Sequence, residues 1–242
     1  MGRAHEVRKA SMAKTSALKA KVYSKYGKEI YLLAKSGGPD PDANLALRRI
    51  IEKAKKSQVP ADVIKRAIDK VKSGVTENYE LQKYEGFGPN NSTIIVECLT
   101  DNVNRTLSQV RPAFTKAKSK LGASGSVSYL YDTISLVSYK GLNEEETLEA
   151  LIMHEVDAKD IEALEDGSIE ITGEPQDLYK IKSAIESVKP DVEFIVDEIT
   201  TIPQEYVTLE GEDMELFTRL ITLLNQSDDV DTIYHNVSNY EG

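Results

Sequence analysis

The apolar residues in the first third of the chain recur at helical spacing. Along the first predicted helix they lie three or four residues apart, as on one face of an α-helix: Leu18, Val22, Tyr26, Ile30 and Leu33. Glycines and prolines in residues 36–42 end this helix, and Asp42 is expected to cap the next one. Similar stripes occupy residues 47–54 and 63–71. The pattern predicts a bundle of three short amphipathic helices that ends near Gly74.

After residue 76 the pattern changes to short β-branched runs that alternate with helices. Residues 79–84 and 92–99 are predicted to be paired strands. A buried stripe from Val103 to Leu121 predicts a long helix, because its apolar residues alternate at spacings of four and three. A further strand is expected at residues 126–131.

The segment 133–202 has its own order of elements. It predicts a strand, a helix, two strands joined by a hairpin turn, a second helix and a final strand. The expected ranges are 133–139, 143–154, 161–164, 169–172, 175–187 and 192–199. This βαββαβ order is the ferredoxin-like pattern.

The rest of the chain is expected to complete the sheet that begins at residue 79. It predicts a strand at 205–209, a helix at 212–225 and a strand at 230–236. The fold class is therefore α+β with three domains, of which the two α/β domains are expected to be ferredoxin-like. The predicted domains are a basic helical domain at residues 1–76, a discontinuous α/β domain at 77–132 and 203–242, and an inserted ferredoxin-like domain at 133–202.

The stretch Gly86-Phe-Gly-Pro-Asn-Asn91 looks at first like a phosphate-binding loop. A dinucleotide-binding loop needs a third glycine and a helix directly after it, because the helix N-terminus supplies the amide donors. Here Asn91 stands at that position and a strand follows. The Gly-Lys-Ser/Thr signature of a Walker loop is also missing. The stretch is therefore predicted to be a hairpin loop with glycines at positive φ.

Charge is distributed very unevenly along the chain. The total net charge is -10, but residues 1–74, called the head here, hold 18 basic and 7 acidic residues and so carry +11. Residues 75–242, the body, hold 30 - 18 = 12 basic and 40 - 7 = 33 acidic residues, a net of -21. A basic head on an acidic body favours docking on a polyanion in one orientation. We expect the head to bind nucleic acid in a salt-dependent way and the body not to bind it.

Composition limits the cellular compartments and the classes of protein that fit this chain. The chain has 242 residues, and 40% of them are hydrophobic, which is enough for two or three ordinary cores. The single cysteine, Cys98, excludes an internal disulfide framework and favours a reducing compartment. A membrane span and a secretory signal are not expected, so a cytoplasmic protein is predicted. The oligomeric state stays open, and we expect a monomer.

Catalytic and metal-binding signatures are not found in the sequence. The three histidines, His5, His154 and His235, lie far apart and form no metal-binding motif. Cys98 sits inside an apolar strand, where a packed thiol is expected rather than a nucleophile. Acidic runs at 143–149, 211–215 and 227–231 are interpreted as solvated faces. No cofactor, metal or catalytic residue is therefore predicted, and an unrecognised enzyme is kept only as an alternative.

Four stretches of the sequence resemble the YebC/PmpR family, which includes the mitochondrial translational activator of cytochrome oxidase subunit I. They are KAKVYSKYGKEI, GGPDPDANLALRRIIEKAKKSQVPADVIKRAIDK, YEGFGPNNSTIIVECLTDNVNRTLSQVRPAF and LGASGSVSYLYD, and an Ile-Tyr-His-Asn element follows near residue 236. Many members begin near Met-Ala-Gly-His-Ser-Lys-Trp, whereas this chain begins Met-Gly-Arg-Ala-His-Glu and has no tryptophan. In this respect it looks like the YeeN-type branch. The resemblance implies a helical domain and two α/β domains.

The resemblance also implies a role, for which two versions exist. Members are described as transcriptional regulatory proteins that bind DNA, and others act in translation at the ribosome, where they relieve stalls at proline-rich stretches. The first version gives DNA-binding transcription regulation through the basic helical domain, and the second gives ribosomal RNA as the partner. The candidate nucleic-acid-binding residues are Arg3, Arg8, Lys9, Lys14, Lys19, Lys21, Lys25, Arg48, Arg49, Lys53, Lys65 and Arg66. Tyr23 and Tyr26 lie beside these charges and are candidates for stacking on bases, although Tyr26 also falls on the apolar stripe.

Overall fold

The computed structural model describes residues 16–74 and 76–240 of the chain. The described residues form two compact units. One contains residues 16–126 and 209–233, and the other contains residues 127–208 and 234–240.

The described part of the head consists of the three helices that the apolar stripes predict. They are α2 (Ser16–Gly37), α3 (Leu45–Lys56) and α4 (Ala61–Lys72). Their apolar faces meet in one core, which includes Ile30, Tyr31, Leu47 and Ile64. The predicted cap at Asp42 is wrong. Asn44 caps α3 instead, because its side chain accepts a hydrogen bond from the Leu47 amide at 3.0 Å.

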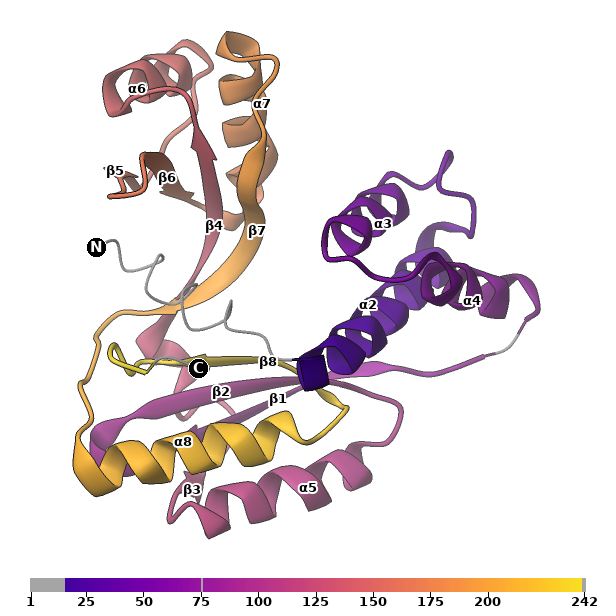
Figure 1. The fold of residues 1–242 in the computed structure, drawn as a ribbon, viewed down its shortest axis with the longest axis vertical. Coiled ribbons are helices and arrows are strands. Elements are labelled where there is room, and N and C mark those ends of the chain that lie inside the picture. The colour runs from indigo at the N-terminus through magenta and orange to yellow at the C-terminus, as the bar shows by residue number, and fades with distance from the viewer. Residues whose placement is uncertain (1–15, 75, 241–242) are drawn as a thin grey trace. The chain divides into compact units, whose positions relative to one another are not determined.

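The first sheet follows the head and has the strand order β3-β1-β2-β8. Its elements are β1 (Glu80–Phe87), β2 (Thr93–Thr100), α5 (Val103–Lys116), β3 (Lys120–Leu121), α8 (Gly211–Asn225) and β8 (Val230–His235). Strand β8 therefore returns to a sheet that began more than a hundred residues earlier, as predicted. Helices α5 and α8 lie on one face of this sheet (Figure 1). The central pair is the antiparallel hairpin β1–β2, so this strand order differs from the ferredoxin-like order expected for it.

The glycine-rich stretch joins β1 to β2, with the short 3-10 helix η1 (Pro89–Asn91) between them. The predicted hairpin is confirmed, but the predicted positive φ of its glycines is wrong: Asn90 and Asn91 have φ of 46° and 61°. The glycines are needed for space instead. A Cβ on Gly86 would lie 2.3 Å from the Phe114 ring, and one on Gly88 would lie 2.4 Å from the Ser92 hydroxyl oxygen.

The second unit contains the βαββαβ segment that the sequence predicts. Its elements are β4 (Tyr131–Lys140), α6 (Glu144–Met153), β5 (Asp160–Ala163), β6 (Ser168–Gly173), α7 (Leu178–Val188) and β7 (Phe194–Pro203), with the 3-10 turns η2 (Ser128–Leu130) and η3 (Pro175–Asp177). The strand order is β5-β6-β4-β7 and every strand pairing is antiparallel, which is the ferredoxin-like arrangement.

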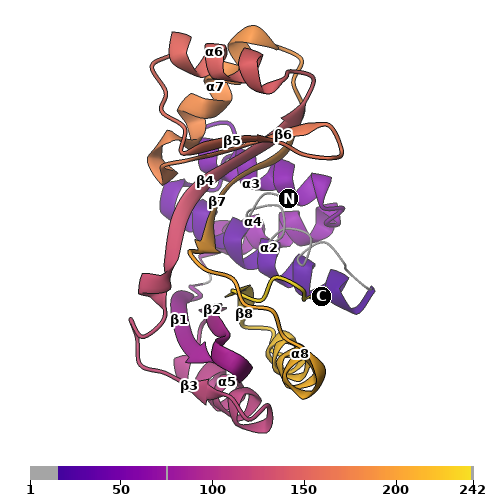
Figure 2. The same ribbon diagram turned by 90° about the vertical axis from the view of Figure 1, so that its left-hand side faces the viewer.

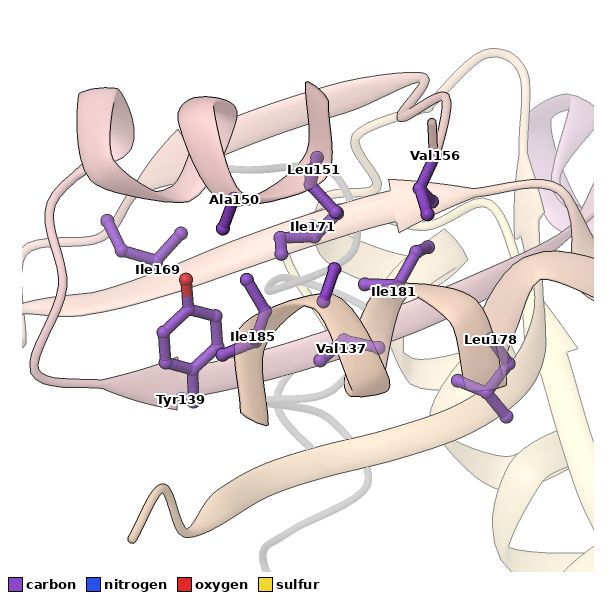
Figure 3. Packing of buried hydrophobic residues seen from close by; sticks show 11 residues of the cluster. Val137, Tyr139, Ala150, Leu151, Val156, Ile169, Ile171, Leu178, Ile181 and Ile185 are labelled. Carbon is purple, nitrogen blue, oxygen red and sulfur yellow. The ribbon is translucent and has the colours of Figure 1, made fainter. Parts of the chain in front are cut away.

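Helices α6 and α7 lie together on one face of this second sheet (Figure 2). The core between the helices and the sheet is apolar, and Ile171, Ala150, Leu151, Ile181 and Ile185 point into it (Figure 3). Its largest ring belongs to Tyr139, whose hydroxyl group lies 2.5 Å from the Thr147 hydroxyl group. This contact satisfies the buried polar end of the ring.

Three sequence-based boundaries are wrong. The separate strand predicted at residues 126–131 is not formed, because residues 128–130 form the 3-10 turn η2 and β4 begins only at Tyr131. Residues 205–209 make an isolated bridge between Val207 and Val237 instead of a strand. The helix predicted to run to Leu121 ends at Lys116, and Lys118 turns the chain with a φ of 51° so that Leu121 enters β3.

Candidate nucleic-acid interface

Five of the candidate residues lie on α3 and α4, the second and third helices of the head. Their apolar positions face the head core, so the basic positions between them face outward. Arg48, Lys65 and Arg66 are exposed, while Arg49 and Lys53 are half-buried. Lys55, Lys56, Lys70 and Lys72 are also exposed on these two helices. We call this set of residues the outer basic surface.

Two arginines of the outer basic surface make local ion pairs. The Arg48 guanidinium group donates hydrogen bonds to the Asp42 carboxylate and to the Pro41 carbonyl oxygen, each at 3.1 Å. Arg66 pairs with Asp62, one turn earlier on α4. Both pairs are solvent-exposed, with side-chain exposures of 45% and 93% for the first and 71% and 66% for the second. Such pairs contribute about 0–1 kcal/mol each, so an incoming phosphate can replace the carboxylate at low cost.

The lysines of α2 have a different environment, because they contact residues of α8, β8 and β2. The Lys21 ammonium group donates a hydrogen bond to the Asn225 side chain at 3.0 Å. The Lys25 ammonium group lies 2.9 Å from the Asp231 carboxylate and 3.1 Å from the Thr232 hydroxyl oxygen. We call the lysines of this face, Lys21, Lys25 and Lys28, the inner basic surface.

Lys28 belongs to an ionic cluster built around Asp229. The Lys28 ammonium group donates to the Leu99 carbonyl oxygen at 2.8 Å and lies 3.4 Å from the Asp229 carboxylate. The Arg105 guanidinium group contacts the same carboxylate through two nitrogens, at 3.0 and 2.8 Å, and the Thr106 hydroxyl group donates to it at 2.9 Å. The Asp229 side chain is only 5% exposed. The Asp229 carboxylate therefore holds both Lys28 of the head and Arg105 of α5.

This cluster is not predicted from the sequence. The expectation that the acidic run 227–231 is a solvated face is wrong for Asp229 and Asp231, since both side chains are largely covered and ion-paired. Lys28 and Arg105 were not among the candidate residues. One signal was available, because Asp229 directly precedes the buried Val230 at the start of a predicted strand, where an unpaired charge is costly.

Burial and ion pairing shift the pKa values of the inner basic surface in opposite directions. Burial lowers the pKa of Lys21 to about 8, and the nearby Asp231 offsets this only in part. Burial also acts to lower the pKa of Lys25, but Asp231 and Glu29 outweigh it, so the pKa is raised overall. Burial acts to raise the pKa of Asp229, but hydrogen bonds from Arg105 and Thr106 lower it overall. Lys25 and Asp229 are therefore both charged at neutral pH.

A polar cavity of about 390 Å³ adjoins the Asp229 cluster. Its walls carry two cations and three carboxylates, together with amide and tyrosine side chains. The lining residues are Lys28, Tyr79, Asp101, Arg105, Gln109, Gln226, Asp228 and Asp229. Because carboxylates outnumber cations there, the cavity does not favour a phosphate.

The remaining candidates divide between core positions and residues that are not described. Tyr23 and Tyr26 pack against the head core, and the Tyr26 hydroxyl group lies 2.9 Å from the Ser57 hydroxyl group. Arg3, Arg8, Lys9 and Lys14 lie outside the described residues, as does the side chain of Lys19. His5 lies there too.

The groups with nucleophilic or metal-binding chemistry occupy structural positions. Cys98 is fully buried in β2, and burial raises the pKa of its thiol to about 12. Burial lowers the pKa of His235 to about 4, and the Val237 amide donates to its ring at 3.3 Å. The His154 ring hydrogen-bonds the Ser187 hydroxyl group at 2.7 Å. Within residues 16–74 and 76–240 no cluster of three or more such ligands could hold a metal ion.

A search of the same residues for a helix with the length and apolar character of a membrane span finds none.

Comparison with known proteins gives matches over nearly the whole chain. Residues 3–74 match the TACO1/YebC protein N-terminal domain, and residues 79–237 match the TACO1/YebC second and third domain. Proteins named probable transcriptional regulatory protein are similar to this chain in Alteromonas mediterranea, with 50% identity over 98% of both chains, and in Marinomonas sp., with 52% identity over 98% of this chain and 99% of the relative. The crystal structure of a conserved hypothetical protein from Aquifex aeolicus is 36% identical and has a TM-score of 0.74, covering 93% of this chain and 92% of that one.

Proposed function

The chain belongs to the TACO1/YebC family, and from this we propose that it is a transcriptional regulatory protein that binds DNA through the outer basic surface of α3 and α4. The observation that carries the proposal is the contrast between the two basic surfaces of the head. Most cations of the outer surface are exposed, with Arg49 and Lys53 half-buried, while the inner surface pairs its lysines with the body. The acidic body repels the polyanion and orients the head toward it.

The proposal assigns the protein no enzymatic activity and a cytoplasmic location. The three domains are taken as 1–76, 77–132 with 203–242, and 133–202. The inserted position of the third domain is supported by β8, which rejoins the first sheet after the β4–β7 segment.

The arrangement of charges on the outer basic surface favours phosphate contacts as the main source of affinity for DNA. Exposed lysines outnumber arginines on the outer surface, and lysine acts as a point charge toward phosphate, whereas base recognition relies more on arginine, asparagine and glutamine. Binding should therefore weaken steeply with salt, with a slope of about -0.9 per phosphate neutralised on duplex DNA. Sequence choice by Arg48, Arg49 or Arg66 would add about 1–3 kcal/mol per base pair recognised.

The test is footprinting of the full chain on genomic promoter fragments, together with sedimentation of the protein from lysate. The proposal predicts a protected segment that is lost when Arg48, Arg49, Lys53, Lys65 and Arg66 are replaced by glutamine. Co-sedimentation with ribosomes that the same replacements abolish, without any promoter protection, would instead support the translational role.

A further inference from the structure

The outward side of helix α6 differs from the outward sides of α5 and α8. On its inward side α6 packs Ala150 and Leu151 into the core of the second unit (Figure 3). On its other sides it exposes Leu148, Ile152 and Met153, whose exposed fractions are 48%, 66% and 69%. Helices α5 and α8, described over their whole length, expose no large apolar side chain to this degree. Because a surface helix normally keeps its outward side polar, a group of exposed apolar residues indicates an interaction surface.

The three exposed residues of α6 form one short ridge. Leu148 and Ile152 are four positions apart, so their side chains are neighbours on the helix surface, and Met153 follows directly. On α7 the exposed apolar residues Tyr179 and Val188 lie at opposite ends of the helix and form no such ridge. We call Leu148, Ile152 and Met153 the α6 ridge.

Glutamates border the α6 ridge, and their charge is not balanced by cations of the same helix. Helix α6 holds four glutamates and no lysine or arginine. Glu144 and Glu146 accept hydrogen bonds from backbone amides of the second unit at 2.8 and 2.9 Å. Glu145 and Glu149 are exposed and form no ion pair with a described residue. Each of these two lies three residues before Leu148 or Ile152, so it borders the ridge.

We propose that the α6 ridge binds an amphipathic helix of a protein partner, in which lysines or arginines flank an apolar stripe. Apolar side chains one turn apart on such a helix can pack beside Leu148 and Ile152, as the ridges of one helix fit the grooves of another. The flanking cations can then pair with Glu145 and Glu149. The C-terminal end of α6 adds attraction, because it carries the negative end of the helix dipole and has no basic residue in its last turn.

The charge of the α6 ridge argues against two other occupants. Nucleic acid would be repelled by the bordering glutamates. A second copy of the ridge would bring Glu145 and Glu149 close to their own counterparts, which is a like-charge contact. The inference goes beyond the proposed function and does not rest on it, because it assigns a protein partner to the second unit and leaves the outer basic surface unchanged.

The first experiment measures binding of a probe peptide to the full chain by fluorescence anisotropy. The probe is a labelled, stapled helical peptide of about four turns, with leucine along one face and lysine on both flanks of that face. A peptide of the same composition in scrambled order, whose leucines do not share a face, is the control. The probe should bind saturably and about tenfold or more tightly than the scrambled peptide, because only the probe presents an apolar stripe between cations.

Substitutions of apolar residues test whether the α6 ridge is the site. Leu148→Gln combined with Ile152→Gln should weaken probe binding about tenfold or more, because the apolar contact is lost. The matched control is Ile195→Gln combined with Ile199→Gln on β7, where the exposed fractions are 47% and 53%. Strand β7 lies at the opposite edge of the sheet from β5, which α6 contacts through Glu144. The control pair should therefore change the affinity less than about twofold. Circular dichroism and urea unfolding verify that both variants are folded.

Substitutions of glutamates test whether the partner must be basic. Glu145→Gln combined with Glu149→Gln should weaken probe binding about fivefold at low salt, because two exposed ion pairs are lost. The difference from the native chain should shrink as salt is added. Glu193→Gln combined with Glu198→Gln removes the same charge at exposed positions and should change the affinity less than about twofold. Equal effects of the two pairs would overturn the proposal, because the ridge would then not select a basic partner.

The second experiment locates the probe on the full chain by nuclear magnetic resonance. Chemical-shift changes should be centred on residues 145–153. Shift changes centred elsewhere, equal binding of the scrambled peptide, or equal weakening by the two apolar pairs would overturn the proposal. Sedimentation equilibrium without the probe adds a further test: a dimer that Leu148→Gln with Ile152→Gln dissociates would show that a second copy covers the ridge, and would also overturn it. None of these outcomes depends on whether the chain binds DNA.

Discussion

The inner and outer basic surfaces of the head have similar residue types and different surroundings. On α2, Lys25 and Lys28 lie within ion-pair distance of Asp231 and Asp229, and their side chains are 34% and 13% exposed. On α3 and α4, Arg48 and Arg66 pair only with exposed carboxylates a few residues away in sequence. Lysine content alone therefore does not identify a nucleic-acid interface. A basic residue is a good candidate for phosphate contact only when its charge is not already paired with a carboxylate from a distant part of the chain.

The largest expected effect comes from removing the carboxylate that holds the inner surface. Asp229→Asn should lower the free energy of unfolding by about 3–5 kcal/mol, because Arg105 and Lys28 would be left facing a neutral group. Urea denaturation followed by circular dichroism measures the change. Asp228→Asn is the matched control, since Asp228 is exposed and its contact with Lys28 uses the backbone carbonyl oxygen. A decrease of the same size in the control would show that the lost stability does not come from the ion pairs around Asp229.

A second prediction distinguishes the two basic surfaces by the salt dependence of DNA binding. Replacing Arg48, Arg49, Lys53, Lys65 and Arg66 by glutamine should reduce the slope of log K against log salt by up to about 5, because each cation removed leaves one phosphate fewer neutralised. Lys21→Gln with Lys25→Gln should leave the slope nearly unchanged, because these lysines are already paired within the protein. The assay is fluorescence anisotropy with a labelled duplex over a range of salt. A larger slope change for the α2 pair would reverse the assignment of the surfaces.

A third prediction concerns two neighbouring lysines on the inner surface. Lys25→Met should lower the free energy of unfolding by about 1 kcal/mol, between the values for exposed and buried pairs, because Asp231 loses its partner. Lys21→Met should be neutral or stabilising, since burial already disfavours the charge of Lys21 and lowers its pKa to about 8. Thermal and urea unfolding of both variants provide the measurement. Equal destabilisation by the two replacements would contradict this account.

The lowered pKa of Lys21 also predicts a small pH effect with a definite sign. Between pH 8 and the ordinary lysine pKa of 10.5, the unfolded chain binds the Lys21 proton more strongly than the folded chain. The stability of the native chain should therefore rise with pH in this window relative to Lys21→Met. Comparing the two chains cancels the titration of the other lysines and tyrosines. A difference that stays constant or falls across the window would show that Lys21 is not desolvated.

Sequence periodicity predicted the order of helices and strands, because helical stripes and β-branched runs reflect local burial. The quoted motifs also predicted the family correctly. The pattern failed where an element depends on a distant partner. Residues 205–209 have strand-like composition but make only one bridge, to Val237, and the two-residue strand β3 exists only because it pairs with β1.

The same limit applies to the candidate interface. Charge and helical position point to Arg48, Lys65 and Arg66, and the structure leaves them exposed. The same pattern points to Lys21 and Lys25, yet their partners lie about 200 residues further along the chain. No local pattern encodes that contact, because it depends on β8 returning to the first sheet.

Lysine acetylation with and without DNA tests the two-surface account most directly. The full chain is treated briefly with an acetylating reagent, alone or bound to duplex DNA, and the modified sites are quantified by mass spectrometry. The account predicts that Lys55 and Lys65 react quickly in the free protein and are protected by DNA, while Lys25 and Lys28 react slowly in both states. Fast modification of Lys25 and Lys28 that DNA suppresses, with Lys55 and Lys65 unaffected, would contradict it.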